Sequence, residues 1–300
     1  MLDLKEIIKD AMSATVGSVS CAYVGQPFDT VKVRMQASPT AIPTSSLSVC
    51  MSLLKVEGLP ALWKGVVPTA TGMMFENIVA FGVNEQLKRT PTFQATLPPI
   101  YTGGATPGRN YLVPKEDIAR PMVIGFMTGC TSAGVLISTE IIKIRAQVST
   151  TVVSSSAIVK DIVKKRGVGG LFAGFDAQLM RDGPFYAVFF GSYELYKFTL
   201  AQAVPGINEE VNYFLSGGFA GMTGWFMAMP FDVPKTILQS DPNARIFGDF
   251  FPLMAKVARE RGVVGGLYAG LGPTLVRAFP SNAALFLGVE YSKKWLDVMF

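Results

Sequence analysis

The stretch PFDTVKVRMQ (27–36) decides the fold, because related stretches return twice, as STEIIKIRAQ (138–147) and PFDVPKTILQ (230–239). Each follows or overlaps the end of an apolar run without a charged residue, at 11–28, 121–139 and 211–231 in turn. Runs of this length match the roughly 20 residues that an α-helix needs to cross a bilayer. The motif therefore adds an acid, and three residues later a lysine, to the end of a predicted membrane span.

Composition supports a membrane protein. The chain has 300 residues, of which 49% are hydrophobic and only 16% charged, and its mean hydropathy is +0.35. These values are typical of a polytopic membrane protein. The absence of histidine excludes His-based general base catalysis and His metal sites, so we expect no enzyme activity, no metal and no cofactor. The net charge of +5 forms no basic stripe, which argues against a nucleic-acid partner.

Two further landmarks follow each motif in the same order. The first is EGLPALWKG (57–65), RGVGGLFAG (166–174) and RGVVGGLYAG (261–270), the last with one extra residue. The second is an acid with a lysine three residues later: Glu85/Lys88, Glu194/Lys197 and Glu290/Lys293. The order predicts three repeats with two spans each. Their predicted bounds are 1–90, 119–205 and 206–300, with a proline-rich inserted loop at 91–118.

Between motif and landmark lie short amphipathic stretches at 47–56, 155–165 and 251–259. They are too short and too polar to span a bilayer, so we expect helices that lie at the surface. The sequence thus predicts an all-α membrane protein with six transmembrane helices and three short surface helices.

The threefold P-x-[D/E]-x-x-K followed by x-[K/R]-x-Q, with the glycine-rich landmark and the later [D/E]-x-x-K, resembles the mitochondrial carrier family. The resemblance covers the chain outside 91–118. It implies a monomeric, threefold pseudosymmetric six-helix barrel, multi-pass in the inner mitochondrial membrane, with the short helices on the matrix side. It also implies exchange of a small solute by alternating access, and lipid partners for which cardiolipin is the candidate. Ser138 and Ile237 depart from the pattern, in place of the proline and of the last basic residue.

The three motifs predict a ring of ion pairs. Within one helix an acid and a lysine at i and i+3 contribute only about 0.2–0.5 kcal/mol, whereas a charge at membrane depth costs roughly 2.5–3.5 kcal/mol. Partners from neighbouring repeats are therefore needed, and pseudosymmetry predicts the pairs Asp29–Lys143, Glu140–Lys235 and Asp232–Lys32. By resemblance this ring is the matrix gate, and it is braced by Gln36, Gln147 and Gln239. The same logic predicts a weaker cytoplasmic gate from Glu85, Lys88, Glu194, Lys197, Glu290 and Lys293.

The even-numbered spans contain ionisable residues in their interior, which makes those residues candidates for substrate binding. Arg181 and Arg277 stand equally far before Glu194 and Glu290, and so lie at one depth. Glu76 lies about one turn nearer the outer mouth, and Asp182 follows Arg181. A basic amino acid fits this set: its carboxylate binds Arg277 and Arg181, its α-ammonium Asp182 and its side-chain cation Glu76.

Two branches of the family compete for the substrate assignment. The ornithine and basic amino acid carriers resemble this chain at Glu76-Asn77, at Arg181-Asp182, where they have Arg-Glu, and at RAFPSNAALFLGVEYS (277–292). The acylcarnitine carrier shares the Arg-Asp pair and the RAFP stretch, but carnitine offers no second cation for Glu76. That difference favours ornithine, arginine or lysine. A proton or fatty-acid uncoupler is the alternative of another class, and a membrane scaffold would need none of these buried charges.

Overall fold

The structure is a computed structural model that describes residues 4–37, 45–76, 115–151 and 153–299. Within these ranges the chain forms helices and no strand. It divides into two compact units. The larger unit comprises Met1–Asn77, Gly134–Gln178 and Met229–Phe300, and the smaller comprises Ile78–Ala133 and Leu179–Ala228. The larger unit contains the motifs of all three repeats.

Three long helices continue through the motifs instead of ending before them. They are α1 (Leu4–Ala37), α5 (Lys115–Val148) and α8 (Glu209–Ser240), and the motif prolines Pro27 and Pro230 lie inside α1 and α8. The predicted loop at 91–118 is too long at its end, because 115–118 form the first turn of α5. Two acidic residues occur in that turn, where the helix dipole favours them. The rest of the loop lies outside the described residues.

The second span of repeats 2 and 3 is also helical, as α7 (Phe175–Ala203) and α10 (Leu271–Met299). In repeat 1 the described part of the corresponding helix covers 66–76. By length and composition, one described helix, Ile118–Val148, is long and apolar enough to cross a membrane. α7 and α10 are nearly as long, but they carry Arg181, Asp182 and Arg277 in their interior.

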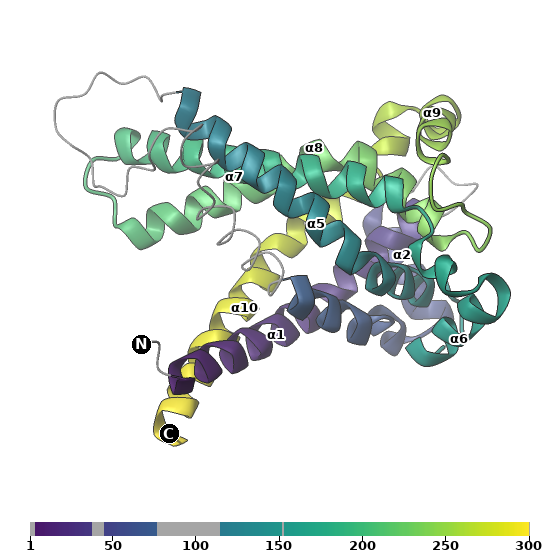
Figure 1. The fold of residues 1–300 in the computed structure, drawn as a ribbon, viewed down its shortest axis with the longest axis horizontal. Coiled ribbons are helices and arrows are strands. Elements are labelled where there is room, and N and C mark those ends of the chain that lie inside the picture. The colour runs from purple at the N-terminus through teal and green to yellow at the C-terminus, as the bar shows by residue number, and fades with distance from the viewer. Residues whose placement is uncertain (1–3, 38–44, 77–114, 152, 300) are drawn as a thin grey trace. The chain divides into compact units, whose positions relative to one another are not determined.

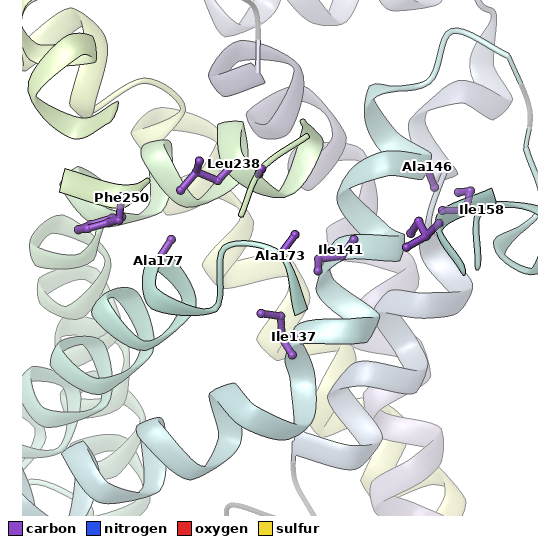
Figure 2. Close-up of a cluster of buried hydrophobic side chains, with 10 residues drawn as sticks. Ile137, Ile141, Ala146, Ile158, Ala173, Ala177, Leu238 and Phe250 are labelled. Carbon is purple, nitrogen blue, oxygen red and sulfur yellow. The ribbon is translucent and has the colours of Figure 1, made fainter. Parts of the chain in front are cut away.

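The three short helices are confirmed as α2 (Ser46–Val56), α6 (Ser155–Arg166) and α9 (Phe250–Arg261). Serine caps begin the first two, since the Ser45 hydroxyl accepts from the Leu47 N–H and the Ser154 hydroxyl from the Ala157 N–H. Isoleucines of α6 and Phe250 of α9 pack with the ends of α5 and α8 in one buried cluster (Figure 2). The cluster fastens the motif end of repeat 2 to that of repeat 3.

The glycine-rich landmark is a turn that joins each short helix to the next long one. Its first and last glycines have φ between +67° and +85°, a conformation that side chains disfavour: Gly58 and Gly65, Gly167 and Gly174, Gly262 and Gly270. Between them lies a 3₁₀ turn in repeat 1 (η1, Leu59–Trp63) and in repeat 2 (η2, Val168–Phe172). In repeat 3 the extra residue is absorbed by a wider π-type turn (η3, Val263–Leu267). Despite the extra residue, Gly262 and Gly270 therefore keep the positive φ of the corresponding glycines in repeats 1 and 2.

α1 and α10 lie side by side along their length (Figure 1). Small residues allow the close approach, because a Cβ on Gly288 would lie 3.0 Å from the Gly17 Cα and 2.9 Å from the Ser20 hydroxyl. The first and last helices of the chain are thus in direct contact.

We predict that Gly270→Ala destabilises the protein more than Gly262→Ala does. Both substitutions put a side chain at positive φ, at a cost of about 1–3 kcal/mol. A Cβ on Gly270 would also lie 2.9 Å from the Lys32 Cγ, whereas no described atom is within 4 Å of one on Gly262. Thermal unfolding of the purified variants in detergent measures the difference. Equal losses would show that the contact with Lys32 contributes nothing.

Candidate functional site

The motif charges of α1, α5 and α8 form three ion pairs between helices. Each pair joins a lysine Nζ to a carboxylate oxygen of another repeat at 2.8 Å: Lys143 to Asp29, Lys235 to Glu140 and Lys32 to Asp232. These are the three pairs that the repeat alignment predicts. Repeat 1 is tied to repeat 2, repeat 2 to repeat 3 and repeat 3 to repeat 1, so the pairs close a cycle, here named the ion-pair ring.

Most members of the ion-pair ring are buried. Asp29, Asp232 and Lys235 are each less than 5% exposed, and Lys32 is 7% exposed. Removing one partner of a buried pair leaves an uncompensated charge, which costs about 3–5 kcal/mol. The three long helices are therefore held together at their motif ends by contacts that no single repeat can make alone.

The three glutamines predicted as braces are fully buried but differ in their partners. The Gln36 amide donates to the Asp232 carboxylate at 2.9 Å, as a brace of the Lys32–Asp232 pair should. The Gln147 amide donates to the Thr30 hydroxyl at 3.3 Å, and the Gln239 amide to the Gln178 carbonyl oxygen at 2.8 Å. By analogy with Gln36, the Gln147 amide would donate to the Asp29 carboxylate. Asp29 already pairs with two cations, which explains why Gln147 has a different partner.

The second cation on Asp29 is Arg277 of α10, one of the residues predicted to bind substrate. Its Nη1 lies 2.9 Å from Asp29 Oδ1, while Lys143 occupies Oδ2 at 2.8 Å. From the sequence, the ion-pair ring and the binding residues are predicted as separate sets. In the structure this arginine joins them.

A second set of contacts, which the sequence analysis missed, surrounds the ion-pair ring. Arginine side chains donate to the carbonyl at the motif glutamine of the next repeat: Arg34 to Gln147 at 2.6 Å, Arg145 to Gln239 at 3.3 Å and Arg261 to Gln36 at 3.2 Å. A cation at a helix C-terminus satisfies exposed carbonyls and suits the helix dipole. Arg34 and Arg145 are the last basic residues of their motifs. In repeat 3, where Ile237 stands at that position, Arg261 from the landmark replaces it.

The landmark of repeat 1 contributes to the same region. Glu57 forms ion pairs with Arg34 at 2.9 Å and with Lys64 at 2.5 Å, and the Lys64 ammonium donates to the Ser149 and Thr150 carbonyls that follow α5. The first residue of the landmark differs between repeats 1 and 3: it is Glu57 in repeat 1, where the motif supplies Arg34, and Arg261 in repeat 3, where the motif has Ile237.

In the smaller unit, Arg181 and Asp182 are partners of each other. Arg181 Nε lies 2.7 Å from Asp182 Oδ1, and the guanidinium stands 5.8 Å from the Trp225 ring centroid of α8. Such a cation–π contact fixes the orientation of the guanidinium. Gly129 of α5 lets the Asp182 backbone approach, because a Cβ there would be 2.5 Å from the Asp182 carbonyl oxygen.

The remaining predicted residues lie at the edge of the described chain or beyond it. Glu76 is half-buried at the end of helix 66–76, and Asn77, Glu85 and Lys88 lie outside the described residues. In repeat 2, Lys197 pairs with Glu194 of its own helix at 2.6 Å. The side chains of Glu290 and Lys293 are not among those described.

The comparisons with known proteins agree with the three repeats. A family model described as mitochondrial carrier protein matches residues 4–94, 114–203 and 208–299. The chain belongs to the mitochondrial carrier family. Members of this family are multi-pass transporters of the inner mitochondrial membrane, not enzymes, and this carrier shares that location.

Individual relatives of this carrier have different substrates in their names. It is 30% identical to the mitochondrial arginine transporter of Arabidopsis thaliana, with 97% of this chain and 94% of the relative covered. It is 32% identical to the mitochondrial carnitine carrier of Saccharomyces cerevisiae, with 96% and 87% covered. It is 30% identical to mitochondrial ornithine transporter 1 of Mus musculus, with 95% and 93% covered. Identity alone therefore does not choose between amino acid and carnitine.

We predict that exchanging the charges of Asp29 and Lys143 together restores part of the transport that either single reversal loses. The rescue stays partial because a lysine at 29 would face Arg277, 2.9 Å from the present carboxylate. Uptake by reconstituted variants is the measurement. Asp29→Lys combined with Lys235→Asp, two residues that are not partners, is the matched control. A double exchange no better than this control would argue against the pairing.

We predict that Arg261→Gln lowers the unfolding temperature, whereas Arg259→Gln, an exposed arginine in the same turn of α9, has little effect. The first change removes the donor to the Gln36 carbonyl, and a hydrogen bond from a charged group contributes about 1.5–3 kcal/mol. Thermal unfolding of both variants side by side provides the test. Indistinguishable unfolding temperatures would mean that this contact does not secure α1.

Proposed function

We propose that this carrier exchanges basic amino acids, namely ornithine, arginine or lysine, across the inner mitochondrial membrane by alternating access. The proposal includes a barrel of six transmembrane helices with threefold pseudosymmetry and the short helices α2, α6 and α9 on the matrix side. The observation that carries it is the closed cycle of ion pairs between α1, α5 and α8, together with charges of both signs inside α7 and α10.

The ion-pair ring is proposed as the matrix gate, formed in the state that the structure shows. Two features support this assignment. The ring closes through all three repeats, and Lys197 of the proposed cytoplasmic gate pairs within its own helix. A carrier that opens to one side at a time should have one ring formed between repeats while the charges of the other pair locally or with water. Cargo binding then shifts the balance between the two states by its differential affinity for them.

The proposed cargo contacts follow the charges. Arg277 and Arg181 bind the α-carboxylate, Asp182 binds the α-ammonium, and Glu76, with Asn77 beside it in sequence, binds the side-chain cation. Each arginine already contacts a carboxylate of the protein. A cargo carboxylate can replace that group, and the guanidinium then keeps an anionic partner. The relatives named as arginine and ornithine transporters support this cargo.

Carnitine is the second candidate, favoured by the likeness to the yeast carnitine carrier and by the Arg181–Asp182 pair. Carnitine has one carboxylate and one quaternary ammonium, which match an arginine and an aspartate. It supplies no second cation for Glu76. The half-buried Glu76 of repeat 1 therefore favours the basic amino acid.

We predict that Glu76→Gln reduces arginine and ornithine exchange about thirtyfold or more, the effect of losing about 2 kcal/mol from a charge pair. The protein should stay folded, because the substitution keeps the size of the side chain. The measurement is counter-exchange in proteoliposomes loaded with basic amino acids or with carnitine esters. Glu260→Gln, which removes an exposed acid from α9, is the matched control.

Three results would contradict the assignment. Normal arginine uptake by Glu76→Gln would remove this residue from cargo recognition. Exchange of carnitine esters without exchange of basic amino acids would favour the second candidate. Proton leak without solute exchange would identify an uncoupler instead of an exchanger.

A further inference from the structure

Arg277 reaches the ion-pair ring because a glycine lies in its path. A Cβ on Gly25 of α1 would stand 2.7 Å from Arg277 Nε and 2.7 Å from the Ser281 hydroxyl. Gly25 and Asp29 are four residues apart and thus on one face of α1. The Arg277 side chain therefore lies against the backbone of Gly25 and reaches the Asp29 carboxylate, one turn further along α1. This route exists only because the side chain at 25 is missing.

The contact between Arg277 and Asp29 uses part of the guanidinium. Nη1 bonds Asp29 Oδ1 at 2.9 Å, whereas Nε is buried and has no hydrogen-bond partner among the described residues. A carboxylate that approaches a guanidinium freely can bond it through two nitrogens, and such a bidentate pair is stronger than one through a single nitrogen. The Asp29 contact is therefore one that another carboxylate can displace.

We propose that Asp29 is an internal competitor of the cargo carboxylate for Arg277, and that this exchange of partners links cargo binding to the matrix gate. The inference rests on the proposed function, in that Arg277 binds the cargo. While the cavity is empty, Asp29 holds Arg277 and keeps its charge compensated. When the cargo carboxylate takes Arg277, Asp29 loses one of its two cations, and its link to Lys143 is all that anchors it in the ion-pair ring.

The proposal makes the carboxylate the part of the cargo that weakens the gate. A diamine made by removing the carboxylate from ornithine can still bind Asp182 and Glu76. It cannot displace Asp29 from Arg277. The diamine should therefore bind without competing against Asp29, and its affinity should not depend on that residue.

The test uses two variants that each remove one side of the same gate pair, Asp29→Asn and Lys143→Gln. Binding of ornithine and of 1,4-diaminobutane to the purified carrier is measured by calorimetry, with Asp29→Glu as the conservative control, since repeat 2 has Glu140 at this position. Asp29→Asn removes the competitor, so the Kd for ornithine should fall about tenfold, a change of about 1.4 kcal/mol. Lys143→Gln leaves Asp29 to Arg277 alone, so the Kd for ornithine should rise. The Kd for the diamine should stay constant in both variants.

The opposite signs separate competition from simple loss of the gate. If both variants shift the Kd for ornithine in the same direction, or if the diamine shifts as much as ornithine, the competition is overturned. Should Asp29→Asn fail to fold, Lys143→Gln still decides, because a lower Kd for ornithine in that variant contradicts the proposal. A wild-type carrier that binds carnitine and not ornithine overturns the basic amino acid assignment alone. The competition is then decided by the same variants with carnitine against choline, its counterpart without a carboxylate.

Discussion

Charges buried at the ends of three helices must find partners on other helices, and the rest of the structure follows from this requirement. Asp29, Lys32, Asp232 and Lys235 are almost completely shielded from solvent. Pairing within a helix is too weak to offset burial. The pairs between repeats, at 2.8 Å each, therefore decide where α1, α5 and α8 end relative to one another within the larger unit. The helices, turns and short helices around them hold these ends in place.

The cycle is not uniform, although the sequence repeats. Asp232 is braced by Gln36, Asp29 is shared between Lys143 and Arg277, and the side chain of Glu140 is one-quarter exposed. The surrounding arginines differ as well, since Arg261 takes over where Ile237 breaks the motif. Each link of the ring thus has its own stability. If the ring is the matrix gate, as proposed, the link that Arg277 touches is the Asp29–Lys143 pair.

Sequence reasoning succeeded where the repeat itself carries the information. Three aligned copies were enough to predict Asp29–Lys143 and its two equivalents, because each acid needs a partner and the next repeat offers one. The same reasoning missed Arg277 on Asp29. That contact joins a residue of the ion-pair ring to one of the predicted binding residues. It also depends on the absence of a side chain at Gly25. The same reasoning also missed Arg261, because the gap at Ile237 does not show which residue fills it, and Arg261 lies in another segment, at the end of α9. The π-type turn at 263–267 was signalled by the extra residue, but its form depends on backbone geometry.

The packing of α1 against α10 has a consequence for the order of folding. Gly17 meets Gly288 at the far end of the chain, and Lys32 finds Asp232 only in the third repeat. Contacts between such distant residues form late. During synthesis, Lys32 of the first motif is made before Asp232, the carboxylate with which it pairs. A chain truncated before the third repeat would therefore lack the carboxylate that compensates the buried Lys32.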